Sequence, residues 1–263
     1  MQLIDIGDII QLRSGKSLPK WALSILRRLI HEQEINTLIR DGYGLQPLPF
    51  LQHVFQSMRL KYRIHGALPP TDKRYIFVAN HPFGGVDGMI LAEILLQHFT
   101  DVGVVANDLL MHIEPLRPLW IPINKFGRQN ILCSHTYNHA MSSPTKQIIT
   151  FPAGICSRWI NGSVMDMKWH NRFIRDALHY KRLVVPIYIV GKLSSRFYAI
   201  YRLRKLLGIN TNVELSLLVD ELFRQKGETI DIFFGDTLDV TTLPGSITAK
   251  RDMVRQKVYE MAR

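Results

Sequence analysis

The chain has 263 residues, of which 46% are hydrophobic and 21% charged, and a formal net charge of +11 at pH 7. This length is typical of one α/β domain with a helical extension, and the composition excludes a disordered chain. Its cysteines, Cys133 and Cys156, offer no disulfide framework, and charged residues interrupt every long apolar run, so no membrane-spanning segment is predicted.

Amphipathic helices are predicted near the start of the chain, which shows no signal-peptide pattern. Residues 18–40 combine apolar and basic side chains at helical spacing, namely Trp21, Ile25, Leu29, Ile30, Lys20, Arg27 and Arg28. Glycines and prolines break this pattern over residues 41–50, and it resumes over residues 50–60. We therefore expect a membrane-associating helical region over residues 1–59 and an α/β domain over residues 60–263.

Strand and helix patterns alternate through the rest of the chain. Strands are predicted within residues 75–80, 102–107, 146–154, 183–191 and 230–235. Helices are predicted within residues 87–99, 166–180, 194–210 and 249–262. Alternation of this kind predicts an α/β sheet.

The segment NHPFGGVDG, residues 80–88, joins a buried strand to a helix, and such loops carry the chemistry of many α/β folds. His81 is suited to accept a proton near neutral pH, and Asp87 can hold the other ring nitrogen and stabilise the imidazolium. Gly84 and Gly85 let the loop curl back and leave backbone N–H groups free to face an anion. The alternative is that Asp87 only caps the helix and the glycines form an ordinary turn.

Three later segments add to this interpretation, although each alone is typical of an ordinary loop or strand. Lys125 and Arg128 lie in a glycine-containing loop and could clamp a phosphate or a carboxylate. The segment FPAGICS, residues 151–157, contains a proline and a glycine that can shape the backbone around a ligand. Pro186 interrupts the predicted buried strand VVPIYIVG.

Taken in order, NHPFGGVD, NKFGRQN, FPAGICS and VVPIYIVG resemble the four motif blocks of the glycerolipid acyltransferase family, which includes glycerol-3-phosphate and lysophosphatidic acid acyltransferases. The resemblance covers about residues 75–190 and implies a mixed, largely parallel sheet flanked by helices. It implies that His81 and Asp87 are the catalytic pair. It also implies a substrate-binding set of Asn80, Gly84, Gly85, Lys125, Arg128, Phe151, Pro152, Gly154, Arg158 and Pro186.

Two departures from the family pattern bear on the substrate. Five residues separate His81 from Asp87 where the family has four, so the glycines must absorb the extra residue. Ala153 and Cys156 stand where the third block of the family has glutamate and arginine, and Arg158 is displaced by two positions. The chain here resembles a bacterial subgroup that esterifies the hydroxyl of an N-(3-hydroxyacyl) amino acid, as in lyso-glycine or lyso-ornithine lipids. Such an acceptor carries a carboxylate in place of a phosphomonoester.

The positive charge indicates an anionic partner, which could be nucleic acid, a phospholipid surface, or an acidic carrier or small molecule. The basic clusters lie in amphipathic helical patterns, which favours a membrane over nucleic acid. The expected membrane contacts are Trp21, Arg27, Arg28, Phe197, Tyr201, Arg202 and Arg204. We expect peripheral attachment to the cytoplasmic face of a bacterial inner membrane. The alternative for residues 194–208 is an ordinary amphipathic helix packed on the sheet.

The resemblance implies transfer of an acyl group from acyl carrier protein or acyl-CoA to a lysolipid hydroxyl, with no cofactor and no metal. His135 and His139 are spaced like a metal pair, but no third ligand is evident, so we expect a polar helix face. Two alternatives remain open. One is a lysophosphatidic acid acyltransferase, and the other is a non-catalytic basic module that binds a membrane or nucleic acid.

Overall fold

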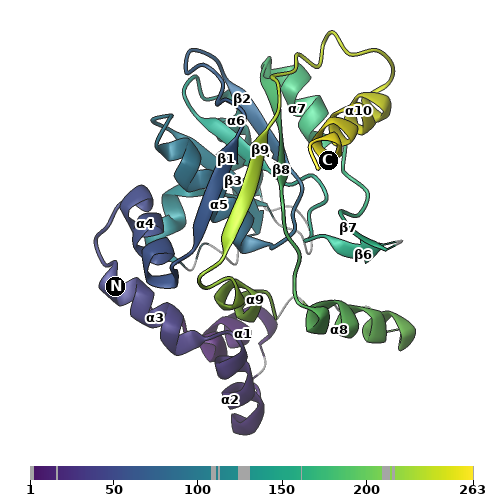
Figure 1. The fold of residues 1–263 in the computed structure, drawn as a ribbon. Coiled ribbons are helices and arrows are strands. Elements are labelled where there is room, and N and C mark those ends of the chain that lie inside the picture. The colour runs from purple at the N-terminus through teal and green to yellow at the C-terminus, as the bar shows by residue number, and fades with distance from the viewer. Residues whose placement is uncertain are drawn as a thin grey trace.

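The computed structural model describes residues 3–15, 17–107, 111, 113–123, 131–160, 162–208, 214 and 217–262. At the centre of these residues lies a seven-stranded sheet with the order β1-β9-β8-β2-β5-β3-β4 (Figure 1). Its strands are β1 (Lys61–His65), β2 (Tyr75–Ala79), β3 (Val102–Asn107), β4 (Trp120–Ile123), β5 (Gln147–Thr150), β8 (Leu183–Ile189) and β9 (Thr229–Phe234).

Most strands of this sheet run in one direction. β8, β2, β5, β3 and β4 are parallel to one another. β9 is antiparallel to β8, and β1 at the edge pairs in parallel with β9. The sheet is therefore mixed and largely parallel, which confirms the predicted fold class. A short antiparallel hairpin of β6 (Arg158–Ile160) and β7 (Ser163–Met165), which was not predicted, follows β5.

Helices cover both faces of the sheet because the side chains of the central strand alternate between two cores. Tyr75, Phe77 and Ala79 of β2 belong to a cluster that includes residues of α4 (Pro47–Met58) and α5 (Gly85–Leu96). The alternate residues Ile76 and Val78 belong to a second cluster, which includes residues of α6 (Ile131–Ser142), α7 (Arg172–Tyr180) and α10 (Ile247–Glu260). A strand buried on both faces reads as a continuous apolar run, as YIFVA does.

Helix α4 packs into the main core although it lies in the predicted N-terminal region. Its buried residues are Phe50, Leu51, Val54, Phe55 and Met58, and they share a cluster with the buried side chains of α5. The packing is therefore continuous across residue 59, where the sequence suggested that the α/β domain begins.

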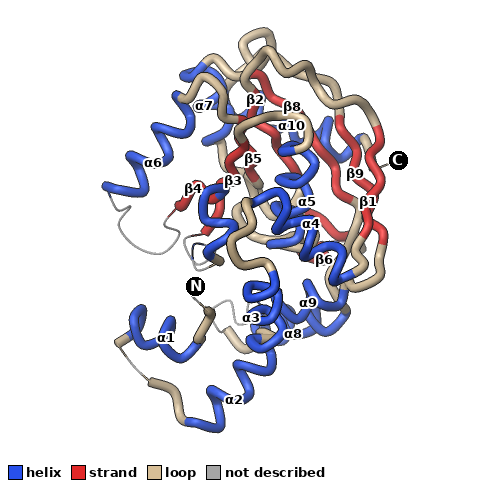
Figure 2. The backbone as a smooth tube through the Cα atoms, turned by 90° about the vertical axis from the view of Figure 1, so that its left-hand side faces the viewer, coloured by secondary structure: helices blue, strands red, loops and turns tan. Residues whose placement is uncertain are grey.

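A second group of helices lies beyond the carboxyl ends of the parallel strands (Figures 1 and 2). They are α1 (Ile6–Ser14), α2 (Lys20–Leu29), α3 (Glu32–Asp41), α8 (Ser195–Leu206) and α9 (Leu218–Arg224). His31, between α2 and α3, lies with Nε2 3.1 Å from Oδ1 of Asp220 on α9, and Arg196 of α8 donates to the same carboxylate at 3.3 Å. These contacts tie the N-terminal helices to α8 and α9. Among the helices that the structure describes, none has the length and apolar character to cross a membrane.

The opposite end of the sheet is held by a buried guanidinium. Arg182, just before β8, is 2% exposed. It donates to the carbonyl oxygens of Met141 at 2.9 Å and Ser143 at 3.0 Å, at the end of α6, and of Lys146 at 2.7 Å, just before β5. A cation at a helix C-terminus also interacts favourably with the helix dipole. Burial and the nearby Arg74 lower the pKa of Arg182 to about 10, so it stays charged at neutral pH.

We expect Arg182→Met to lower the free energy of unfolding by about 2–4 kcal/mol, because it leaves several buried carbonyl groups without a donor. The measurement is urea denaturation followed by circular dichroism. Lys73→Met is the matched control, since Lys73 is an exposed cation at the same end of the sheet, and it should change stability by less than about 0.5 kcal/mol. Equal stability of the two variants would contradict a structural role for Arg182.

Candidate active site

The candidate site begins where β2 ends. Asn80, the next residue, is 4% exposed. Its side-chain amide donates to the carbonyl oxygen of Ile189 at 2.9 Å and accepts from the N–H of the same residue at 2.7 Å. Asn80 therefore extends the pairing between β2 and β8 by one side chain and fixes the point where the loop leaves the sheet. Both ends of its amide are used within the protein.

His81 and Asp87 are brought together by this loop. Nδ1 of His81 lies 2.9 Å from Oδ2 of Asp87, and the same oxygen accepts the backbone N–H groups of Phe83 and Gly84, each at 3.0 Å. The Asp87 side chain is fully buried, whereas that of His81 is 17% exposed. The N-cap of α5 is Gly84 and not Asp87, which is the third residue of the helix, and the catalytic role of Asp87 stays a prediction. Asp87 accepts the N–H of Gly84, the N-cap residue of α5, and also contacts His81.

Gly84 has a φ of 80°, a left-handed conformation that favours glycine. A Cβ atom there would also lie 3.3 Å from the side chain of Leu218. Gly85 has no positive φ and faces open space. It is the first residue of α5. Of the two glycines, Gly84 is therefore the one whose backbone conformation requires glycine.

The environment of the pair suits proton transfer. Burial raises the pKa of Asp87, and the hydrogen bonds from His81, Phe83 and Gly84 oppose that shift. With Nδ1 donating to Asp87, Nε2 carries the lone pair that can accept a proton. The imidazole also stacks on Phe151, with ring centroids 4.1 Å apart and an interplanar angle of 22°. The ring is thus oriented by a carboxylate at its edge and by an aromatic ring on its face.

The segment FPAG supplies that aromatic face. Gly154 adopts a φ of 68° and donates its N–H to the carbonyl of Phe151 at 2.9 Å, which closes a tight turn. The carbonyl of Pro152, which is buried, accepts the N–H of His170. Ala153, where the resemblance implied glutamate, is 6% exposed and belongs to the second core cluster. The turn therefore orients Phe151 and contributes no charge at position 153.

Arg158 lies in a buried cluster of charges. Its Nη2 donates to Oε1 of Glu214 at 3.0 Å, and its Nη1 lies 2.9 Å from Sγ of Cys156. The guanidinium also lies against the ring of Tyr201, 4.9 Å from its centroid. Arg204 of α8 contacts the same Glu214 carboxylate at 2.8 Å. The contacts of Arg158 are thus to other residues of the protein. Its role in substrate binding stays a prediction.

Two of the expected membrane contacts on α8 are wrong. Phe197 is 0% exposed and Arg204 is 5% exposed, because Phe197 packs in the main core and Arg204 pairs with Glu214. Tyr201 is half-buried and Arg202 is exposed. The apolar side chains that α8 and its C-cap leave exposed are Leu203, Leu206 and Leu207. Helical spacing alone could not choose between these faces, since apolar residues occur on both.

The three membrane contacts predicted near the N-terminus lie on α2. Trp21 is 70% exposed and Arg28 is exposed. Arg27 pairs with Asp5 at 2.8 Å and with Glu32 at 3.1 Å, so its charge is partly neutralised within the protein.

Three predicted binding residues, Pro186, Lys125 and Arg128, remain. Pro186 is inside β8, opposite Val78 of β2, and its carbonyl accepts the N–H of Gly235 at 2.9 Å. Lys125 and Arg128 lie outside the described residues. Within the described part of the chain, no group of three His, Cys, Asp or Glu residues could hold a metal ion.

Asp166 is the residue at this site that the sequence analysis missed. Residues 166–180 were expected to form one helix, but α7 begins only at Arg172. Asp166 follows β7, is 3% exposed, and accepts the backbone N–H of His81 at 3.1 Å. The two residues are 85 positions apart, and no local pattern connects them.

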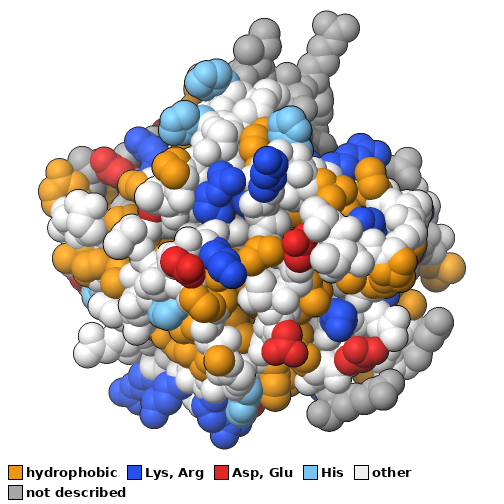
Figure 3. Space-filling model, turned by 90° about the horizontal axis from the view of Figure 1, so that it is seen from above, with side chains coloured by type: hydrophobic (Ala, Val, Ile, Leu, Met, Phe, Trp, Pro, Cys, Tyr) orange, Lys and Arg blue, Asp and Glu red, His pale blue; other side chains and the backbone are white. Residues whose placement is uncertain are grey.

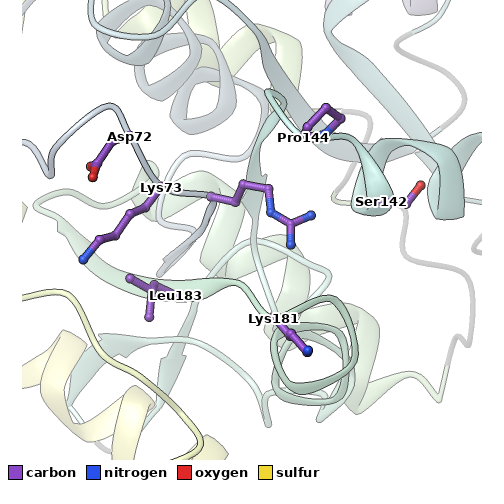
Figure 4. Close-up of a pocket in the computed structure, with 7 residues that line it drawn as sticks. Asp72, Lys73, Ser142, Pro144, Lys181 and Leu183 are labelled. Atoms are coloured by element: carbon purple, nitrogen blue, oxygen red, sulfur yellow. The ribbon is translucent and has the colours of Figure 1, made fainter.

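A hollow of about 420 Å³ lies at the other end of the sheet. It is lined by residues that precede β2 and β8, including Lys73, Arg74 and Lys181 (Figure 4). Figure 3, a view from above, shows Lys and Arg side chains near the middle of that face. β2 separates this hollow from His81 by about 16 Å, at roughly 3.3 Å per residue, so the hollow is not part of the His81 site.

Comparison with known proteins shows the family of this chain. The sequence model of a family described as Acyltransferase matches residues 12–263. Two relatives, both named lyso-glycine lipid O-acyltransferase, come from Bacteroides thetaiotaomicron and Phocaeicola vulgatus. The first is 34% identical over 98% of this chain and 97% of its own length, and the second is 33% identical over 98% and 95%.

Among solved structures, the lysophosphatidic acid acyltransferase PlsC from Thermotoga maritima aligns with a TM-score of 0.47 and 14% identity, over 98% of this chain and 90% of its own. The family match spans nearly all of the chain, and both relatives align along almost their whole length. The protein belongs to this acyltransferase family and is an acyltransferase.

Proposed function

We propose that this acyltransferase joins a fatty acyl group to the hydroxyl of an N-(3-hydroxyacyl)glycine, a lyso-glycine lipid. The observation that carries the proposal is the His81–Asp87 hydrogen bond just after the carboxyl end of a buried strand, in a chain whose near-full-length relatives bear that name. The donor is an acyl thioester on acyl carrier protein or coenzyme A. Both carriers are anionic, which suits a chain with a net charge of +11.

The proposed reaction needs one base. Nε2 of His81 takes the proton of the lipid hydroxyl as the oxygen attacks the thioester carbonyl carbon. The new C–O bond forms, the C–S bond breaks, and the departing sulfur takes up the proton from His81. Asp87 holds Nδ1–H and stabilises the imidazolium in between. Because the amides of Phe83 and Gly84 point at Asp87, they orient the base and do not serve the oxyanion.

The charge of the acceptor distinguishes the two candidate lipids. A glycine lipid presents a carboxylate, and lysophosphatidic acid presents a phosphomonoester. We propose that Lys125 and Arg128 hold this acidic group. In the segment FPAGICS and the arginine that follows it, Ala153 is buried and uncharged, and Arg158 is paired with Glu214. This segment therefore offers no unpaired cation of the kind that a phosphate acceptor would favour. This supports the carboxylate acceptor over the phosphate acceptor.

The first test concerns the catalytic pair. Asp87→Asn keeps an oxygen for the amides of Phe83 and Gly84 but removes the charge that supports the imidazolium. We expect it to lower kcat by about 10²–10⁴-fold, as in other histidine bases that lose their carboxylate, and we expect His81→Ala to be at least as impaired. The measurement is ester formation from an acyl thioester, followed by mass spectrometry. Thermal melting of each variant reports whether the fold is retained.

Folded His81→Ala and Asp87→Asn variants with wild-type rates would contradict a catalytic pair. That result, together with unchanged binding to anionic vesicles, would favour the non-catalytic binding module instead.

The second test concerns the acceptor. Purified enzyme receives a labelled acyl carrier protein thioester and one of three detergent-dispersed acceptors: lyso-glycine lipid, lyso-ornithine lipid or lysophosphatidic acid. We expect kcat/KM for lyso-glycine lipid to exceed that for lysophosphatidic acid by at least about 100-fold, the discrimination of about 3 kcal/mol that one mismatched charged group can supply. Preference for lysophosphatidic acid would retain the catalytic pair and overturn the proposed acceptor. Replacing the donor by acyl-CoA identifies the carrier.

We also propose that the enzyme docks peripherally on an anionic membrane, on its cytoplasmic face. The supporting surface is formed by α2, with Trp21 70% and Ile25 61% exposed, and by the end of α8, with Leu206 84% and Leu207 62% exposed. Arg28 and Arg202 are exposed on the same helices. Both helices lie at the carboxyl ends of the parallel strands, where His81 is (Figure 1). Apolar side chains flanked by cations suit a lipid interface.

The third test is vesicle binding. We expect Trp21→Ser/Ile25→Ser and Leu206→Ser/Leu207→Ser each to weaken binding to phosphatidylglycerol-containing vesicles by about tenfold or more, since burying one such side chain contributes roughly 1.5–3 kcal/mol. Sedimentation with vesicles gives the partition coefficient. Ile64→Ser is the control, because Ile64 is a 42% exposed apolar residue on the edge strand β1. Wild-type binding by both double variants would exclude this surface.

A further inference from the structure

Asp166 is a second buried carboxylate beside His81, in addition to Asp87. Its Oδ1 accepts the backbone N–H of His81 at 3.1 Å and the hydroxyl of Ser157 at 2.6 Å, and its Oδ2 accepts the indole N–H of Trp169 at 2.8 Å. Three donors on one buried carboxylate compensate much of the cost of removing it from water. The three hydrogen bonds therefore stabilise the ionised form of Asp166.

Ser157 completes the enclosure of the His81 backbone. Its own N–H donates to the carbonyl oxygen of His81 at 2.7 Å, while its hydroxyl donates to Asp166. Both backbone polar groups of His81 are therefore held, the N–H by Asp166 and the carbonyl by Ser157. The ring is oriented separately by Asp87 and Phe151.

Asp166 is itself anchored to the C-terminal helix. Its N–H donates to the hydroxyl oxygen of Tyr259 on α10 at 2.8 Å, and Trp169 is 1% exposed in the second core cluster. Displacement of Asp166 would disturb these contacts, so the carboxylate is held in place by the core. The position of His81 is thus coupled to the packing of α10 on the sheet.

The charge of Asp166 also acts on the imidazole. Burial raises the pKa of Asp166, whereas the hydrogen bonds from Ser157 and Trp169 and a positive charge on His81 lower it. A charged Asp166 and a positive charge on His81 therefore attract each other. The charged and titratable groups that contact His81 are Asp87 on α5, at the imidazole, and Asp166 after β7, at the backbone N–H. Tyr259 and Arg255 of α10 contact the backbone of Asp166.

We propose that Asp166 is a positioning residue for the acyl transfer, which holds the backbone of His81 and supports, together with Asp87, the positive charge that His81 acquires when it takes the proton of the acceptor. The inference rests on the proposed role of His81 as the base. It adds a third residue to the His81–Asp87 pair. Asp166 acts on His81 through the backbone N–H and through the electrostatic field of its carboxylate, and it does not contact the substrate.

The test compares Asp166→Asn with Asp176→Asn. Asp176 is the control: it is a half-buried carboxylate on α7 that accepts the hydroxyl of Tyr137 and pairs with Arg172. We expect Asp166→Asn to lower kcat by about 10- to 100-fold, less than the loss of a general base itself, with KM values for donor and acceptor within about threefold of wild type. The acid limb of the rate profile should move to lower pH, because an imidazolium without this carboxylate loses its proton more readily.

A second readout needs neither donor nor acceptor. In the enzyme labelled with ¹³C-histidine, the midpoint of the His81 imidazole titration, measured by NMR, should move to lower pH in Asp166→Asn and stay in place in Asp176→Asn. Ser157→Ala, which removes one donor to Asp166 and keeps the other contacts, should lower kcat by a smaller factor and covers the case in which Asp166→Asn does not fold. This titration remains decisive even if the acceptor proves to be another lysolipid.

An unmoved titration midpoint in folded Asp166→Asn, or a kcat within about threefold of wild type, would overturn the proposal. The proposal would also be overturned if Asp166→Asn and Asp176→Asn lost activity and thermal stability to the same extent, because that result describes a purely structural carboxylate. Failure of the acceptor test with a shifted His81 midpoint would refute the proposed substrate and leave the role of Asp166 intact.

Discussion

The buried carboxylate of Asp87 accepts three hydrogen bonds on one oxygen, from the ring of His81 and from the amides of Phe83 and Gly84. A buried charge is costly unless hydrogen bonds compensate it, and the three donors on Oδ2 hold the loop around Asp87. Gly84 supplies the left-handed turn in that loop, and α5 places Asp87 in its first turn. The remainder of the site depends on this geometry, because it decides where Nε2 of His81 points.

Other charges organise the structure around that loop. Arg158 and Arg204 converge on Glu214 and hold α8 against the hairpin that follows the FPAG turn. Asp220 receives His31 and Arg196, and so joins the N-terminal helices to α8. At the far end, Arg182 ties α6 to the start of the sheet. The two ends are therefore fastened by polar contacts and the middle by apolar packing on both faces of β2.

The placement of the helices relates the site to its proposed surroundings. A lysolipid acceptor resides in a membrane, whereas an acyl thioester carrier arrives from water. The exposed apolar residues of α2 and the end of α8 lie at the same end of the molecule as His81 (Figures 1 and 2). Docking through them would hold the reactive nitrogen near the lipid surface. The burial of Phe197 and Arg204 moves the expected contact on α8 to Leu203, Leu206 and Leu207.

The sequence by itself determined the α/β class, β2 and α5, and the loop that carries His81 and Asp87, because apolar runs, periodicity and a glycine turn are local patterns. Only the tertiary structure decided that β9 runs against β8, that Arg158 is buried on Glu214, and that Asp166 holds His81. Each of these joins segments far apart in the chain. Periodicity says that a side chain is buried, but its partner is chosen by how the helices and strands pack, which no local pattern records.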